Sequence, residues 1–112
     1  MRVQLVKTIS ATLAATSYPV ASYGTPFLRG NDCVLMLSKD GDWAGGAITI
    51  KTDNSVTSSG AAAWETIQAA SDMDAATTEM IHFYNVNIGD NIEITAVAPS
   101  AGTCSVFLLG DS

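Results

Sequence analysis

Apolar and polar side chains alternate along much of this chain with the period of a β-strand. The clearest case is residues 91–98, in which apolar side chains occupy every second position and Asn91, Glu93 and Thr95 stand between them. Successive residues of a strand point to opposite faces, whereas a helix repeats every 3.6 residues. The pattern therefore predicts a half-buried strand over 91–98.

Turn signals separate this stretch from an apolar run on either side, at 79–87 and 103–109. Gly89 followed by Asp90 tolerates the positive φ of a tight hairpin. Pro99 presets φ for a turn that Gly102 can end. We predict that residues 79–109 form an antiparallel three-stranded meander.

Further short strands are predicted at 2–9, 33–37, 47–52 and 61–70. In the first, Val3 and Leu5 share a face, and Val6 breaks the alternation. In 61–70 the Ala-rich ends also allow a helix, but Trp64 and the Thr66–Ile67 pair favour a strand. Residues 71–78 read as a loop, with one helical turn capped by Ser71 as the alternative. Seven or eight short strands are typical of a β-sandwich or barrel, and we expect an antiparallel, jelly-roll-like sandwich.

Residues 10–28 differ from the rest, because they are rich in Ala, Thr and Ser and contain Pro19 and Pro26. A proline pushes the residue before it toward an extended conformation. We predict an extended arm or long connection, with a short strand near Val20 as an option. The arm would lie on its own domain or on a partner, and its own domain is favoured.

Length and charge limit the classes of function. A chain of 112 residues suits one domain, 1–112, in which 1–28 form the N-terminal strand and arm. The formal charge of −6 and the scattered basic residues disfavour nucleic-acid binding. Ser and Thr interrupt the apolar stretch after Lys7, so we expect no signal peptide, and no stretch is apolar enough to cross a membrane.

The candidate chemistry is sparse. Cys33 and Cys104 read as small buried side chains, and a disulfide would require neighbouring strands. Asp40-Gly41-Asp42 resembles the start of a calcium loop, but Lys51 stands where that loop has its Glu, so a simple turn is expected. We expect no catalytic residue, metal or cofactor.

Two alternative sets of residues belong to other classes of function. Asp72, Asp74 and His82 could serve a small hydrolase, although none lies in a recognisable motif. Trp43 and Trp64 could stack on a sugar, and Trp43, in a Gly-rich loop, is the more plausible exposed one.

Two predicted strands are apolar on both faces, whereas a two-layer sandwich needs one apolar face for each strand. Phe107 and Leu109 stand opposite Val106 and Leu108, and Phe83 and Tyr84 belong to a second strand of this kind. A second surface should therefore be covered, by the arm or by another subunit. We predict a homo-oligomer with interface candidates Phe83, Tyr84, Phe107 and Leu109.

Several stretches resemble small virion proteins of tailed bacteriophages. They are Gly-Gly-Ala-Ile-Thr-Ile-Lys-Thr-Asp, Ala-Trp-Glu-Thr-Ile, Val-Asn-Ile-Gly-Asp-Asn-Ile-Glu-Ile-Thr-Ala-Val and Gly-Thr-Cys-Ser-Val-Phe-Leu-Leu-Gly, within residues 45–110. The likeness is to β-sandwich decoration, or cement, and head-fibre proteins.

The resemblance implies a trimeric, non-enzymatic protein on the capsid surface, made in the host cytoplasm, with the major capsid protein as its partner. The aromatic residues of the arm, Tyr18, Tyr23 and Phe27, are then the capsid-contact candidates. The alternative is a receptor- or glycan-binding module of a phage tail or fibre that uses Trp43 and loop tyrosines.

Overall fold

The structure is a computed structural model that describes residues 2–24, 27, 33–40, 42–53, 64–68, 81–86 and 91–110, with the backbone alone in 64–68 and 81–86. This part of the chain contains eight strands and one short 3-10 helix. They are β1 (Arg2–Ile9), β2 (Leu13–Pro19), η1 (Val20–Tyr23), β3 (Cys33–Lys39), β4 (Ala47–Asp53), β5 (Trp64–Gln68), β6 (Ile81–Val86), β7 (Asn91–Val97) and β8 (Cys104–Gly110). The all-β class, the eight strands and the strand at Trp64 confirm the sequence predictions.

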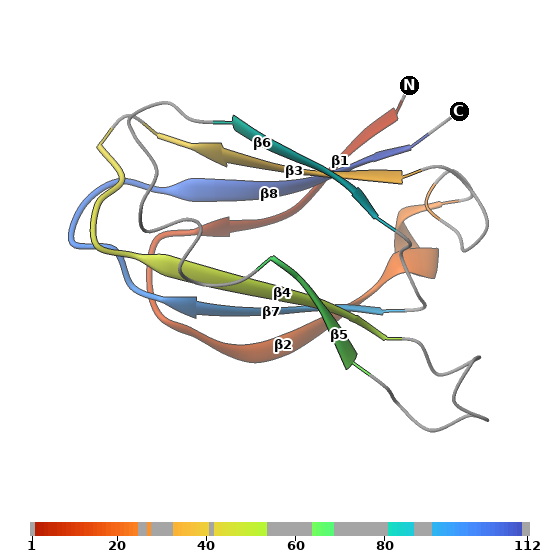
Figure 1. Ribbon diagram of the computed structural model, residues 1–112, viewed down its shortest axis with the longest axis horizontal. Coiled ribbons are helices and arrows are strands. Elements are labelled where there is room, and N and C mark those ends of the chain that lie inside the picture. The colour runs from red at the N-terminus through yellow and green to blue at the C-terminus, as the bar shows by residue number, and fades with distance from the viewer. Residues whose placement is uncertain are drawn as a thin grey trace.

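The strands form two antiparallel four-stranded sheets that face each other (Figure 1). The first sheet has the order β1-β8-β3-β6, and the second has the order β2-β7-β4-β5. Strands β1 and β8 pair along their whole length, from Arg2 opposite Gly110 to Ile9 opposite Cys104. The two ends of the chain therefore lie side by side in one sheet.

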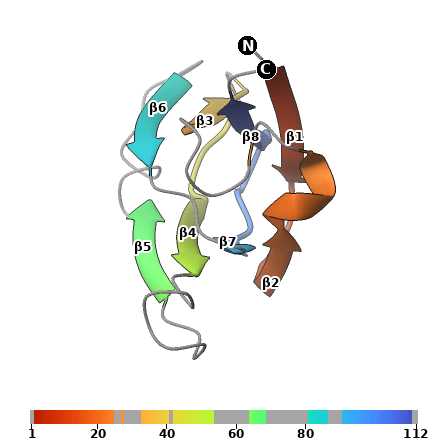
Figure 2. The same ribbon diagram turned by 90° about the vertical axis from the view of Figure 1, so that its right-hand side faces the viewer.

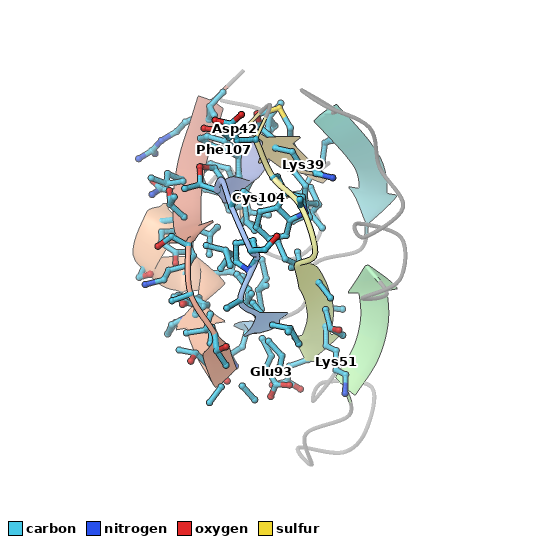
Figure 3. All side chains as sticks on the ribbon, turned by 90° about the vertical axis from the view of Figure 1, so that its left-hand side faces the viewer. Lys39, Asp42, Lys51, Glu93, Cys104 and Phe107 are labelled. Atoms are coloured by element: carbon cyan, nitrogen blue, oxygen red, sulfur yellow. The ribbon has the colours of Figure 1, made fainter. Side chains whose placement is uncertain are left out.

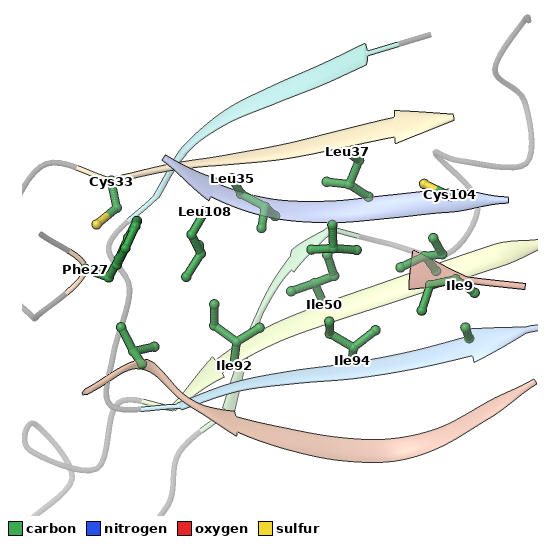
Figure 4. Packing of buried hydrophobic residues seen from close by; sticks show 14 of the residues in the cluster. Ile9, Phe27, Cys33, Leu35, Leu37, Ile50, Ile92, Ile94, Cys104 and Leu108 are labelled. Atoms are coloured by element: carbon green, nitrogen blue, oxygen red, sulfur yellow. The ribbon is translucent and has the colours of Figure 1, made fainter. Parts of the chain in front are cut away.

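The core fills the space between the sheets, as Figure 4 shows. Alternate residues of β3 and β8 point inward from the first sheet, and those of β4 and β7 point inward from the second. Leu35, Leu108, Ile50 and Ile94 are completely buried there. Each such side chain contributes roughly 1.5–3 kcal/mol of hydrophobic stabilisation.

The predicted meander is wrong. β6 pairs with β3, β7 pairs with β2 and β4, and β8 pairs with β1 and β3. The chain therefore crosses from one sheet to the other at both predicted turns, and no tight hairpin joins β6 to β7. Turn residues reverse the chain but do not select the next partner, because both sheets need strands with one apolar face.

The predicted arm is also wrong. Residues 13–19 form the strand β2, which pairs with β7 through contacts such as Tyr18 opposite Ile92, and η1 follows directly. Figure 2 shows β2 and η1 at the same edge of the molecule as β1. The segment lies on its own domain, as favoured, because Val20 and Phe27 are buried in the core.

A β-bulge in β1 decides which side chains enter the core. The register with β8 shifts between Leu5 and Lys7, so that Val6 is the extra residue. An extra residue reverses the alternation of faces beyond it. Ile9 is consequently buried, whereas Val3 and Leu5 lie on the outer face, 55% and 46% exposed.

Candidate functional site

The outer face of the first sheet carries no charged side chain at any position that the structure describes. Neighbouring strands align residues of the same kind in three rows across β1, β8 and β3. The rows are Val3–Leu109–Val34, Leu5–Phe107–Met36 and Thr8–Ser105–Ser38. We call these nine residues the uncharged face.

The third row is polar but neutral. The hydroxyl groups of Thr8 and Ser105 are 3.1 Å apart and share a hydrogen bond. Cross-strand hydroxyl pairs of this kind stabilise a sheet without adding charge to it. The uncharged face therefore consists of two apolar rows with a hydroxyl row at one end.

The outer face of the second sheet differs in character. Its rows place Ser17 beside Glu93 and Lys51, and Thr49 beside Thr95. Figure 3 shows Lys51 and Glu93 at the second sheet and Phe107 at the first. The two outer faces thus have different chemistry, and the first is the one that water solvates poorly.

The four interface candidates have different positions. Phe107 lies in the middle of the uncharged face and is half-buried, which suits an interface. Leu109 is only 8% exposed, so most of its surface is already covered within one chain. The register aligns Phe83 with Met36 and Tyr84 with Leu35, but the side chains of β6 lie outside the described part.

The sequence interpretation missed Val3 and Leu5, the exposed apolar members of the uncharged face. Their shared face was visible in the alternation, but it was read only as one side of a strand. The signal that could have placed them outside was Val6, whose break in the pattern is the bulge.

One of the three capsid-contact candidates is contradicted. Phe27 is completely buried within the core, and the Arg2 guanidinium lies 5.8 Å from the centre of its ring. An aromatic side chain enclosed in this way cannot reach a partner.

Tyr18 and Tyr23 are half-buried and pack against the core. Burial raises the pKa of both hydroxyl groups, and the charge of Tyr18 raises the pKa of Tyr23 further. Both phenols therefore remain neutral at physiological pH, and their exposed parts are available for contact.

Trp43 is buried, contrary to the expectation that it is exposed. Its ring is 5% exposed and lies against Gly46, where any side chain would collide with it. The Lys39 ammonium stands 5.9 Å from the ring centre. A sugar cannot stack on a ring enclosed in this way, so the predicted glycan platform loses its exposed tryptophan.

The loop that contains Trp43 is a hydrogen-bonded turn and not a calcium loop. The Asp42 amide donates to Asp40 Oδ1 at 2.8 Å, and the Trp43 amide donates to the Asp40 carbonyl at 2.9 Å. The expected simple turn is confirmed. The loop also bonds to the β7–β8 connection, where the Ser100 amide donates to the Ala44 carbonyl at 2.8 Å.

The two cysteines are buried and form no disulfide. Their strands are neighbours, but the register places Cys33 opposite Gly110 and Cys104 opposite Lys39, at opposite ends of the pair. Burial raises the pKa of the Cys104 thiol to about 12, and the charge of Lys39 opposes this only in part. The thiol is therefore protonated and unreactive at neutral pH.

The remaining candidate chemistry finds no support in the described residues. Within them, no three His, Cys, Asp or Glu side chains are grouped as metal ligands. Asp72 and Asp74 lie outside the described residues, and so does the side chain of His82. In the part that the structure describes, no helix has the length and apolar character needed to cross a membrane.

Comparisons with known proteins find no family model, no curated protein and no solved structure that matches this chain.

Proposed function

We propose that this protein is a non-enzymatic virion subunit that binds the outer surface of a bacteriophage capsid and stabilises it. We further propose that its two sheets form a jelly-roll sandwich. The order β1-β8-β3-β6 against β2-β7-β4-β5 supports this, because all strands that are consecutive in sequence lie in opposite sheets except β4 and β5, which pair with each other. The jelly roll is an architecture of viral capsid proteins, lectins and cupins.

Fold alone does not decide between these functions, so the proposal depends on a surface. The observation that carries it is the uncharged face, which leaves Val3 and Leu5 about half exposed on a small acidic protein. We take this exposed apolar surface as support for a role in an assembly. The resemblance to decoration proteins supplies the kind of assembly, a homotrimer seated on the major capsid protein.

Tyr18 and Tyr23 are the remaining candidates for contact with the capsid. They lie at the end of β2 and in η1, at an edge of the second sheet. A subunit could therefore bind the capsid through this edge and other subunits through the first sheet. Half-buried aromatic side chains suit such a contact, because they are held in place and still offer apolar area.

Co-sedimentation tests this function. Shells assembled from the major capsid protein of the same virion, without this protein, are mixed with increasing amounts of the purified chain. The proposal expects saturable binding and a higher temperature of shell disruption. Tyr23→Ala should weaken binding, whereas Lys51→Ala, on the outer face of the second sheet, serves as the control. Absence of binding, together with binding to an array of host glycans, would favour the tail or fibre module.

A further inference from the structure

We infer that the uncharged face is a self-association surface, that its occupant is a second copy of this chain, and that the exposed edge residues Val3 and Leu5 belong to it. The inference rests on the homo-oligomer of the proposed function and assigns its interface. The residues that carry it are Val3, Leu5, Val34, Met36 and Phe107.

The distribution of charge identifies the occupant. Each chain has a formal charge of −6, so two copies repel one another overall. They can approach most closely where neither carries charge, and the uncharged face meets this condition at every described position. A partner with a strongly basic surface would find no acidic side chain on this face at any described position.

The arrangement of the rows also favours a second copy. Two apolar rows and one hydroxyl row run across three strands, so the character of the face changes along the strands and not across them. Two copies can thus meet with apolar rows on apolar rows in a closed, symmetric assembly. Packing of this kind needs no ion pair and no buried polar group without a partner.

The edge of β1 argues for contact through the face and against addition of a strand. The bulge at Val6 interrupts the regular spacing of the backbone along this edge, and Lys7 beyond it is charged and exposed. Bulges and lysines are the features that protect edge strands from pairing with another chain. Val3 and Leu5 therefore extend the apolar face and do not open a new sheet edge.

The size of the face predicts the strength of association. Three strands about 4.8 Å apart, with seven residues at about 3.3 Å each, cover on the order of 330 Å². A standard interface buries about 800 Å² for each partner, so this one is small. We expect association that depends on concentration in the micromolar range, and a large effect of single residues at the centre or the exposed edge.

Sedimentation equilibrium from about 1 to 200 μM tests the inference. The wild-type mass should rise from 11.6 kDa toward a whole multiple of that value. Leu5→Asp and Leu5→Lys should each raise the apparent dissociation constant at least tenfold, because either charge would be buried without a partner. Val97→Asp is the matched control, since Val97 is equally apolar and 59% exposed but lies on β7 of the second sheet.

Salt gives an independent test. Raising the salt concentration from 50 to 500 mM screens repulsion between acidic copies, so association should become tighter. Circular dichroism and the urea midpoint show whether each variant remains folded. Phe107→Ser, at the centre of the face, is the second variant if Leu5→Asp fails to fold.

Three results would overturn the inference. The first is a wild-type monomer at every concentration, and the second is association that Leu5→Lys strengthens. The third is a loss of association with Val97→Asp that is as large as the loss with Leu5→Asp. Shell binding is measured separately by co-sedimentation. A folded monomer that still binds shells would refute the self-association and leave the decoration function intact. An oligomer that does not bind shells would support the self-association and refute the decoration function.

Discussion

Replacing Phe27 with Ala separates the two roles that this residue could have, a contact residue or part of the core. Its side chain is completely buried and belongs to the main cluster between the sheets. Truncating a buried Phe to Ala costs about 3–5 kcal/mol, from the lost transfer energy and the cavity left behind. The stacked Arg2 guanidinium adds about 0.5–1 kcal/mol, because this cation–π contact is partly exposed.

The expected loss is a large share of the total stability of a domain of this size, about 5–15 kcal/mol. At about 4 °C for each kcal/mol, the melting temperature should fall by roughly 14–24 °C. Urea unfolding followed by circular dichroism measures the change, with Val97→Ala, at an exposed position, as the control. A loss below about 1 kcal/mol together with weaker shell binding would refute the burial argument and restore Phe27 as a contact residue.

Further predictions concern two glycines near the Trp43 loop and the two buried cysteines. Gly102→Ala should lower the free energy of unfolding more than Gly45→Ala does. The φ angles of the two glycines are similar, 79° and 71°, but a Cβ at Gly102 meets the backbone of Trp43, whereas one at Gly45 meets the Ser100 hydroxyl at 3.3 Å. Equal urea midpoints for the two variants would contradict this. The pKa of Cys104 is raised to about 12 in the folded chain from 9.0, so its contribution to stability is complete below pH 9 and is lost as the pH rises toward 12. In the wild type, the free energy of unfolding should therefore fall by about 1.4 kcal/mol for each pH unit over this window, and Cys104→Ala should reduce that slope. An unchanged slope would be inconsistent with a buried neutral thiol. Iodoacetamide at pH 8 should label neither Cys33 nor Cys104 until urea unfolds the protein, and rapid labelling of the native chain would contradict their burial.

The local elements of this protein are determined by its sequence. Alternation over 91–98 predicted β7, and the apolar runs around it predicted β6 and β8. The Asp40–Asp42 turn followed from the side-chain oxygen of Asp40, which can reach an amide two residues further on. Such features depend on neighbours along the chain, which is why residue types alone suffice to predict them.

Pairing and burial were decided by the tertiary structure. Period-two alternation tells which residues share a face, but not which face is inside or which strand is adjacent. For this reason β6, β7 and β8 were wrongly joined in a meander, although each pairs with strands distant in sequence. The bulge at Val6 is a similar case, since only pairing with β8 shows that Ile9 turns inward and Leu5 outward.

The same limit applied to single aromatic residues. Phe27 and Trp43 lie in segments rich in small or turn-forming residues, which suggested exposure, yet both are enclosed by distant parts of the chain. Gly102 leaves room for the backbone at Trp43 across the β7–β8 connection, a contact that no local pattern contains. The uncharged face likewise exists only once β1, β8 and β3 lie side by side, because its rows join the two ends of the chain to its middle.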